Sequence, residues 1–193
     1  VYKRQTFATP LECDFLIIGT GLSGLYAALY ASKFGNVCII TKSSIDESNS
    51  YWAQGGIAAA IDHNDSIESH FNDTISVGSG LNHEKAVKVL VKEGFDRVNE
   101  LIESGMEFDS GSDGLDLGIE GGHSNRRILH ALGNETGKAT VDFLRKKIEK
   151  NKKIKILDGT SVIELFSDKK QCYGCLVQSD KEKKKIGIKS KST

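Results

Sequence analysis

The chain has 193 residues, with 26 basic and 26 acidic side chains that give a formal net charge of zero. This length can bury a sizeable core in one large domain, while the balanced charge offers no basic surface for nucleic acid, and the basic segments 145–147, 152–153 and 183–185 are expected to be solvated. The longest apolar run, residues 15–31, is interrupted by a glycine-rich turn and hydroxyl residues, which excludes a membrane span.

The first elements in the chain form a β-α-β pattern. Residues 15–18 are an apolar strand, residues 22–34 have helical spacing, and residues 37–41 form a second apolar strand. Gly35 and Asn36 mark the end of the helix. The pattern fits the ~30 residues of a parallel β-α-β unit, so we predict a parallel sheet.

The turn between this strand and helix carries three glycines with the spacing G-x-G-x-x-G, at Gly19, Gly21 and Gly24. Glycines at this spacing permit a tight turn, a close approach of a pyrophosphate to the backbone, and close packing of helix on strand. The first N–H groups of the helix then face the phosphates. The motif alone is weak evidence, but its place between a strand and a helix predicts a dinucleotide site.

Three helices are predicted in the middle of the chain. The first starts at residues 65–66 and ends at 78–80, the second is capped by Asn82, and the third covers about 138–150, with a glycine- and aspartate-rich loop over 105–122. The side chains expected to face the core are Ile67, Phe71 and Ile75 in the first helix, Val87, Leu90, Val91, Val98, Leu101 and Ile102 in the second, and Val141, Leu144 and Ile148 in the third.

Short strands are predicted in the last part of the chain, over residues 154–157, 161–166, 173–178 and 186–189. The expected fold is therefore α/β, with a parallel sheet, a helical insertion and a β-meander. We expect a tail over residues 1–12 and a partial domain over 13–193, because the chain opens on Val1 and ends abruptly, as a fragment of a longer protein would.

The four cysteines are expected to be reduced. Cys13 and Cys38 lie in or beside apolar strands, where a thiol fills space as a small apolar group. Cys172 and Cys175 form a lone C-x-x-C without a second ligand pair, and on a regular strand their side chains point to opposite faces. We therefore expect no metal site and a cytoplasmic protein.

The end of the second strand lacks the carboxylate that usually binds a ribose hydroxyl in a dinucleotide fold. Thr41 and Lys42 occupy that place, and the next carboxylates are Asp46 and Glu47. Ordinary NAD binding is therefore disfavoured. Two interpretations of Lys42 stay open: it binds the 2′-phosphate of NADP, or it lies beside an adenosine ribose or a diphosphate oxygen.

A second glycine motif, A-Q-G-G-I at residues 53–57, follows an aromatic pair. With its flanks, residues 49–60, it resembles the signature of the fumarate reductase/succinate dehydrogenase flavoprotein family, in which this segment lies against the isoalloxazine ring of FAD. The resemblance implies a Rossmann-like FAD-binding domain. Backbone amides of Gly55 and Gly56 would stabilise the negative charge that develops on the flavin during reduction.

Family members that bind FAD covalently carry a histidine five residues before the glutamine of this segment. Asn49 stands there, and an amide cannot form that bond, so the resemblance implies FAD held non-covalently. The cofactor-binding residues carried over from the resemblance are Gly19, Thr20, Gly21, Leu22, Ser23, Gly24, Lys42, Asn49, Ser50, Tyr51, Trp52, Ala53, Gln54, Gly55, Gly56 and, through its backbone, Val162.

A third segment, E-G-G-H-S-N-R-R-I-L-H-A at residues 120–131, continues to Thr136 and Gly137. It resembles a motif of the L-aspartate oxidase branch of the same family, with G-N-E-T-G at 133–137 in place of the usual G-D-A-T-G. The resemblance implies oxidation of L-aspartate to iminoaspartate, which feeds quinolinate and NAD biosynthesis. Oxygen or fumarate would reoxidise the flavin, and quinolinate synthase is an expected downstream partner.

Glu120 is the residue that the resemblance assigns to the substrate ammonium group. His123, Arg126 and Arg127 offer cations to the two carboxylates, although at least one of the adjacent arginines is expected to be a surface or helix-end charge. For His130 we favour a packed, hydrogen-bonded histidine or a flavin contact over a catalytic group.

Two alternative functions stay open. A soluble fumarate reductase or succinate dehydrogenase-type flavoprotein would share the flavin segments but would not use an amino acid, and a non-catalytic NADP-binding module would use Lys42 for a phosphate. In the family, an A-T-G-G segment, the proton-donating arginine and a capping domain come after the position of Thr193. The 193 residues alone are therefore expected to be inactive.

Overall fold

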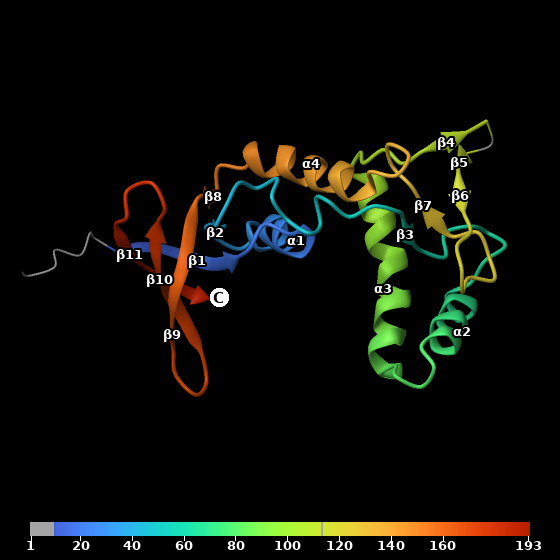
Figure 1. Cartoon of the computed structure of the whole chain (residues 1–193), viewed down its shortest axis with the longest axis horizontal. Helices are drawn as coiled ribbons and strands as arrows, with labels where there is room; N and C mark the ends of the chain where they lie inside the picture. The colour runs from blue at the N-terminus through green and yellow to red at the C-terminus, as the bar shows by residue number, and fades with distance from the viewer. Residues whose placement is uncertain (1–9, 113) are drawn as a thin grey trace, which may run out of the picture. The chain divides into compact units, whose positions relative to one another are not determined.

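The computed structural model describes residues 10–112 and 114–193, and the chain divides into two compact units (Figure 1). The first unit combines Val1–Trp52, as far as it is described, with Val141–Thr193, and the second is Ala53–Thr140. Of the predicted tail over 1–12, residues 1–9 lie outside the described part. None of the helices in the described ranges combines the length and the apolar character that a membrane-spanning helix needs.

The first unit is built on the predicted β-α-β pattern. Strand β1 (Leu11–Ile18) leads through helix α1 (Leu22–Ala31) to strand β2 (Val37–Ile40), which is parallel to β1, and β8 (Ile154–Leu157) adds parallel to β2. Helix α1 ends three residues earlier than predicted, because the N–H of Phe34 turns back to the carbonyl of the last helical residue.

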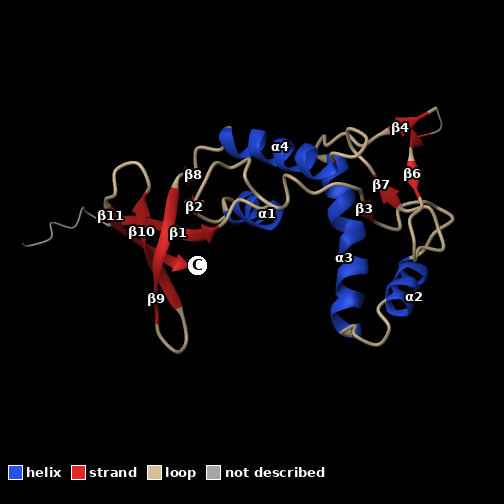
Figure 2. Cartoon of the chain, viewed as in Figure 1, coloured by secondary structure: helices blue, strands red, loops and turns tan. Residues whose placement is uncertain are grey.

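The β-meander completes this sheet. Strands β9 (Thr160–Ser167), β10 (Cys172–Ser179) and β11 (Lys185–Ser192) are antiparallel, and β11 also pairs parallel with β1. The resulting order is β8-β2-β1-β11-β10-β9. Figure 2 shows the strands of the chain in red. Strand β1 begins at Leu11, four residues before the predicted start, because Leu11 pairs with Ile188 of β11. The predicted parallel sheet followed by a meander is confirmed.

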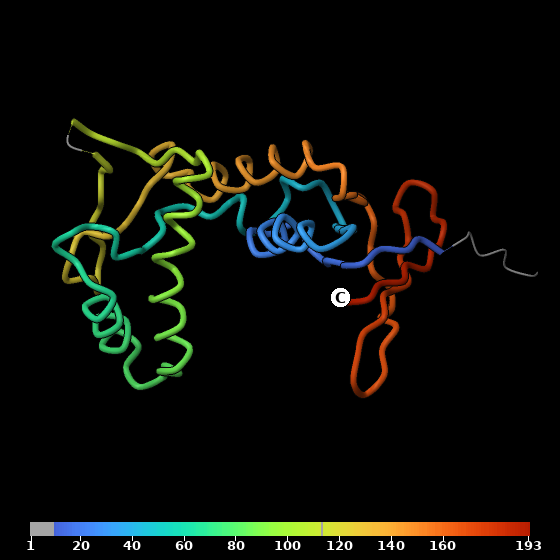
Figure 3. Tube along the Cα trace, turned by 180° about the vertical axis from the view of Figure 1, so that it is seen from behind, coloured from blue at the N-terminus to red at the C-terminus, as the bar shows by residue number. Residues whose placement is uncertain are grey.

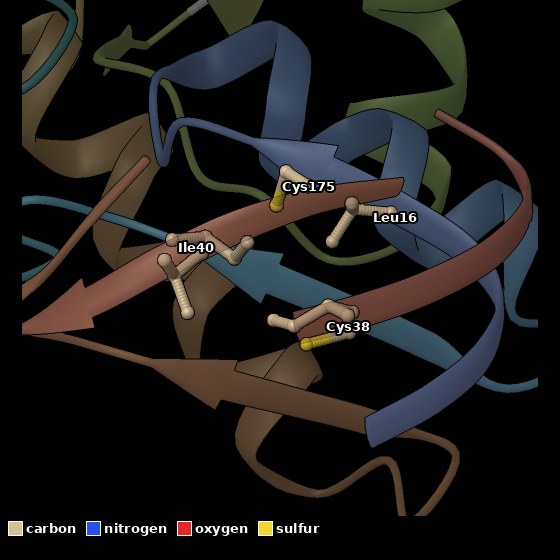
Figure 4. Close-up of a cluster of buried hydrophobic side chains, with 6 residues drawn as sticks. Leu16, Cys38, Ile40 and Cys175 are labelled. Carbon is tan, nitrogen blue, oxygen red and sulfur yellow. The ribbon is translucent and has the colours of Figure 1, made fainter. Parts of the chain in front are cut away.

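A cluster of apolar side chains from β1, β2, β10 and β11 is buried on this sheet (Figure 4). Its buried members are Leu16, Cys38, Ile40, Cys175, Val177 and Ile188, and Cys13 packs against them half-buried. Burial raises the pKa of the Cys175 thiol to about 11, so that this thiol stays protonated at neutral pH. Cys13 and Cys38 thus pack as the predicted apolar fillers, and Cys175 joins them in the cluster.

Strand β10 contains a bulge that the sequence reading missed. Cys172 pairs with Ser167 and Cys175 with Leu165, so three steps along β10 match two along β9. Gly174 between them has φ +135°, a conformation that favours glycine. The bulge breaks the regular alternation from which Cys172 and Cys175 were predicted to point to opposite faces, and both thiols are free.

The second unit contains two helices packed side by side, α2 (Ile67–Val77) and α3 (Glu84–Glu103) (Figure 3). The prediction that Asn82 caps α3 is wrong. The ring of His83 accepts the first-turn N–H instead, and the Asn82 side chain donates to the carbonyl of Thr74 at the end of α2. The side chain of Asn82 therefore bonds to the end of the preceding helix and not to the start of α3.

The buried faces of α3 and α4 (Thr136–Glu149) follow the apolar pattern, except that Leu90 is 66% exposed. The residues buried as predicted are Val87, Val91, Val98, Leu101, Val141, Leu144 and Ile148. Helix α2 departs more strongly from the pattern. Ile67 is exposed, contrary to prediction, and Phe71 and Ile75 are only half-buried, whereas the buried residue of α2 is the polar His70.

Among the described residues of the second unit, five two-residue strands occur. None of them was predicted, because so short a strand has no periodicity to read. Strands β3 (Ile57–Ala58), β7 (Ile128–Leu129) and β6 (Leu117–Gly118) form a small sheet in the order β3-β7-β6. Strands β4 (Ser110–Gly111) and β5 (Gly114–Leu115) form a separate pair. The small sheet brings the second glycine motif beside the segment that carries Glu120.

Candidate functional site

The glycine-rich turn of the first unit has the geometry that its spacing predicts. Gly19 has φ +108°, and its N–H donates to the carbonyl of Ile40 at 2.8 Å. A Cβ on Gly24 would overlap the carbonyl oxygen of Gly19 and lie 3.2 Å from its carbonyl carbon. Helix α1 thus packs onto the turn so closely that a side chain at Gly24 is excluded.

A cavity of about 680 Å³ opens beside this turn in the first unit. Its volume falls in the range of ligand sites, about 300–1,000 Å³. The residues that line it are Ile18, Gly19, Thr20, Gly21, Ile40, Thr41, Lys42, Glu47, Ser48, Asn49, Ser50, Thr160, Ser161 and Val162. The ends of β1 and β2, the start of β9 and the loop after β2 therefore meet around one hollow.

The start of α1 at this cavity is suited to an anion. Gly21 is the N-cap residue and supplies no side chain, and the first turn holds no acidic residue. The N–H of Leu22 donates to Ser50 Oγ at 3.0 Å, and a Cβ on Gly21 would lie 3.2 Å from that oxygen. Helix N-termini of this kind bind phosphate through their N–H groups and dipole.

Seven of the predicted cofactor residues line the cavity, which brings together the glycine turn, the end of β2 and β9. They are Gly19, Thr20, Gly21, Lys42, Asn49, Ser50 and Val162. Sequence reasoning missed Thr41, which is buried and accepts a hydrogen bond from the Thr20 hydroxyl at 3.2 Å, and the start of β9 at Thr160 and Ser161. A polar residue that follows a buried strand was the available signal for Thr41.

The loop that supplies Ser48, Asn49 and Ser50 to this cavity is tied to helix α4. Arg145 Nη1 lies 2.5 Å from Asp46 Oδ1 in this loop, and Arg145 Nη2 lies 3.2 Å from Asp142 Oδ1. Arg145 was predicted to be solvated surface. It is instead 28% exposed and forms an ion pair with Asp46. This pairing could not be predicted, because Asp46 lies far away in the sequence.

The second glycine motif lies in the second unit, against the small sheet. A Cβ on Gly56 would overlap Ile128 Cγ2 and lie 2.6 Å from the carbonyl oxygen of Leu129. Gly55 has φ +79°, and its N–H donates to Asn134 Oδ1 at 2.6 Å. Asn134 thus anchors the motif, which gives a physical role to the position where the family more often has aspartate.

The other predicted cofactor residues do not line the cavity of the first unit. Tyr51 and Trp52 form an edge-to-face ring pair with Trp52 72% exposed, and Ala53 and Gln54 are exposed. Leu22 and Ser23 belong to the first turn of α1. Their predicted contacts with the cofactor stay predictions.

Glu120 lies on the loop between β6 and β7, with its side chain 54% exposed. Its Oε1 is 3.9 Å from Nε2 of His130, whose ring also lies 3.1 Å from the position that a Cβ on Gly56 would take. A half-exposed carboxylate thus stands beside a histidine and the second glycine motif. Arg126 on the same loop is exposed, with Nη1 donating to the carbonyl of Leu117.

Arg127 differs from its predicted role, because it is fully buried. Its guanidinium donates to both oxygens of Asp65 at 2.7 and 2.8 Å, to Asp73 at 2.8 Å and to Ser69 at 3.0 Å. The fifth N–H faces His123 Nδ1 at 3.4 Å, so these partners account for all five donors. The five N–H groups of Arg127 are therefore all directed at described groups of the chain itself, which leaves none for the predicted contact with a substrate carboxylate.

The groups around Arg127 have shifted acidities. The backbone N–H of Ser124 lowers the pKa of Asp73, and the Ser124 hydroxyl and Arg127 lower it further, against the opposing effect of burial. Burial lowers the pKa of His70, and the charge of Arg127 adds to this effect. The ring of His70 lies 5.7 Å from that of His123. At neutral pH the cluster thus holds charged Asp73 beside a neutral His70.

Within residues 10–112 and 114–193, the structure groups no three His, Cys, Asp or Glu side chains as metal ligands would be. The backbone N–H groups and hydroxyl groups around the cavity of the first unit are suited to an organic ligand. The predicted residues thus fall into two sets, one around the cavity of the first unit and one around Glu120 in the second.

A family model described as FAD binding domain matches residues 14–193. Over 185 residues the chain is 40% identical to a chloroplastic L-aspartate oxidase of Oryza sativa subsp. japonica, covering 93% of this chain and 28% of that relative. It is 39% identical over 171 residues to the L-aspartate oxidase of Bacillus subtilis (strain 168), covering 88% of this chain and 32% of that relative. The chain therefore spans a third or less of the length of these relatives.

Solved structures share the fold. The Sdh1 complex of Mycobacterium smegmatis in the apo form matches with a TM-score of 0.86 and 28% identity, over 93% of this chain and 33% of that one. A quinol-fumarate reductase with menaquinol molecules matches with a TM-score of 0.88 and 24% identity, over 95% of this chain and 32% of that one. The second likeness bears on the fold alone.

Proposed function

Because the chain belongs to the FAD binding domain family, we propose that it carries the cofactor site of a flavin enzyme that oxidises L-aspartate to iminoaspartate. FAD is the cofactor of this chain. The observation that carries the substrate proposal is Glu120, a half-exposed carboxylate beside His130 on the segment that resembles L-aspartate oxidases. The sequence relatives of that name support the same substrate.

The residues of the first unit fit an adenosine diphosphate group. A Cβ on Gly24 would overlap the turn, so glycine there keeps the start of α1 close to the cavity. We propose that the N–H groups of α1 bind the diphosphate, while Lys42 lies beside a ribose or a diphosphate oxygen and the Val162 backbone meets adenine. The family assignment favours this role of Lys42 over an NADP phosphate.

Asn49 supports a non-covalent mode of binding. It lines the cavity and stands where family members with covalent FAD carry a histidine. A carboxamide is a poor nucleophile, so this position offers no bond to the flavin. The proposed binding therefore needs no covalent bond between the flavin and the protein.

In the proposed reaction, L-aspartate loses a hydride from Cα and a proton from its ammonium group, and FAD held at this site would supply the acceptor for the hydride and its two electrons. Glu120 binds the substrate ammonium and so orients the Cα hydrogen, because a charge-assisted hydrogen bond fixes direction as well as distance. Arg126 and His123 are proposed to bind the substrate carboxylates. Reoxidation by oxygen or fumarate, quinolinate synthase as a downstream partner and a cytoplasmic location stay predictions.

A product assay of the full-length protein tests the substrate proposal. With L-aspartate and oxygen, we expect iminoaspartate, detected as oxaloacetate and ammonia after hydrolysis, and little oxidation of succinate. Oxidation of succinate without oxidation of L-aspartate would instead favour the fumarate reductase or succinate dehydrogenase-type alternative, which the likeness to the Sdh1 complex also supports.

A further inference from the structure

One face of helix α2 and the residue just before its N-cap carry polar side chains at every fourth position. Asp65, Ser69 and Asp73 follow this spacing, and each bonds to Arg127. The side chain of Asp65 is 1% exposed and that of Asp73 18% exposed. Since residues four apart lie on the same side of a helix, α2 presents one continuous polar stripe to a single buried cation.

The stripe also holds the loop that precedes Arg127. The backbone N–H and the hydroxyl of Ser124 both donate to Asp73 Oδ2 at 2.8 Å, and the Asn125 amide donates to Asp65 and to Ser69 at 3.0 and 2.9 Å. Asp73 therefore accepts three hydrogen bonds, two from Ser124 and one from Arg127. The Asp73 carboxylate thus links the loop at Ser124 to the buried guanidinium of Arg127.

The other end of the same loop is closed by backbone bonds. Strands β6 and β7 pair Gly118 with Ile128, and the N–H of Arg127 donates to the carbonyl of Gly118 at 3.1 Å. Between these two ties, the N–H of His123 donates to the carbonyl of Glu120 at 3.2 Å. The path of Glu120 is therefore fixed on both sides, while its carboxylate remains half-exposed.

We propose that Asp73 and Arg127 are positioning residues that hold the Glu120 loop so that the Glu120 carboxylate meets the substrate ammonium group. This inference rests on the proposed function. A buried ion pair adds little net stability compared with apolar residues, but it can specify one arrangement of the groups around it. Here that arrangement sets the preference for an amino acid over the same dicarboxylate without its amine.

The test uses Asp73→Asn in the full-length flavoprotein. The amide keeps the size of the side chain and one acceptor oxygen, but it loses the charge that pairs with Arg127 and strengthens the hydrogen bonds from Ser124. We expect KM for L-aspartate to rise roughly tenfold or more, because small misplacements of an orienting group are costly. FAD content should stay within about twofold of that of the unmodified protein, and KM for fumarate should rise less than KM for L-aspartate, because fumarate has no ammonium group for Glu120 to bind. Glu68→Gln, on the exposed surface of α2, is the matched control and should change neither KM.

A double-mutant cycle separates positioning from a general loss of structure. If Asp73 acts through Glu120, the variant that combines Asp73→Asn with Glu120→Gln should have a KM for L-aspartate no higher than Glu120→Gln alone. The proposal would be overturned if the rise in KM of the double variant equalled the product of the rises in the two single variants. An unchanged KM in Asp73→Asn would also overturn it. If Asp73→Asn does not fold, Ser124→Ala removes one bond to Asp73 and should raise KM in the same direction, and an unchanged KM there overturns the proposal.

The unmodified protein distinguishes this inference from the proposed function. If it does not oxidise L-aspartate, the proposed function fails and the inference fails with it. If it oxidises L-aspartate and Asp73→Asn does so with the same KM, only the positioning role fails.

Discussion

Replacing Gly24 by alanine is expected to weaken FAD binding through the backbone of the glycine-rich turn. The added Cβ would overlap the carbonyl oxygen of Gly19 and lie 3.4 Å from Ile17 Cγ2. The first of these neighbours is main chain, so it cannot rotate away. Either α1 moves off the turn or the turn opens, and both displace the N–H groups at the start of α1.

The expected size of the effect follows from this overlap. Inserting a methyl group into a tightly packed site costs about 1–3 kcal/mol. If the displaced turn takes up that cost when the cofactor binds, the Kd for FAD rises about 5-fold to 150-fold. A loss of this size is measurable without complete loss of flavin.

The assay is a titration of apoprotein with FAD, followed by quenching of flavin fluorescence, on the full-length protein. Gly94→Ala is the control, because Gly94 lies within α3 and, apart from its chain neighbours and the nearby backbone of its own helix, no described atom is within 4 Å of the added Cβ. That variant should bind FAD normally and gain about 0.5–1 kcal/mol of stability. Equal Kd values for Gly24→Ala and the unmodified protein would refute the assignment of this turn.

Three other variants test the second unit. Arg127→Leu leaves Asp65 buried without its cation and should cost about 3–5 kcal/mol, seen as a lowered Tm by calorimetry, whereas an unchanged Tm contradicts the ion pair. Because the pKa of His70 is lowered from 6.5 in the folded state, the unfolded state binds more protons below pH 6.5, so stability is full above that pH and falls below it. The variant His70→Gln should lose this part of the pH dependence of Tm. An unaltered profile of Tm against pH would contradict the lowered pKa of His70. Glu120→Gln should raise KM for L-aspartate about 10-fold to 150-fold while KM for fumarate changes less, and equal losses remove its role with the ammonium.

The elements around the cavity were predictable because their signals are local. The strand, the glycine spacing and the helix of the β-α-β unit follow one another within about thirty residues, and the structure has them in that order. The face of α4 with Val141, Leu144 and Ile148 was equally readable, because apolar side chains recur there at helical spacing and all three are buried.

The surroundings of Arg127 could not be read in this way. The apolar pattern predicts that Ile67 is buried and gives no sign that Asp65 and Asp73 are covered, because a polar residue is expected to be exposed unless its partner is known. The partner is a cation more than fifty positions later, and only the folded chain brings it onto the same face of α2. The bulge at Gly174 was missed for a similar reason, since it depends on pairing with β9 and β11.

Release of flavin from the purified full-length protein tests the central claim most directly. The account predicts a yellow protein whose flavin absorption passes entirely into the supernatant after acid precipitation, because Asn49 offers no covalent bond. The released compound should be identified as FAD by its mass. A colourless protein that also fails to take up added FAD would contradict the account, and flavin that stays with the pellet would contradict the role of Asn49.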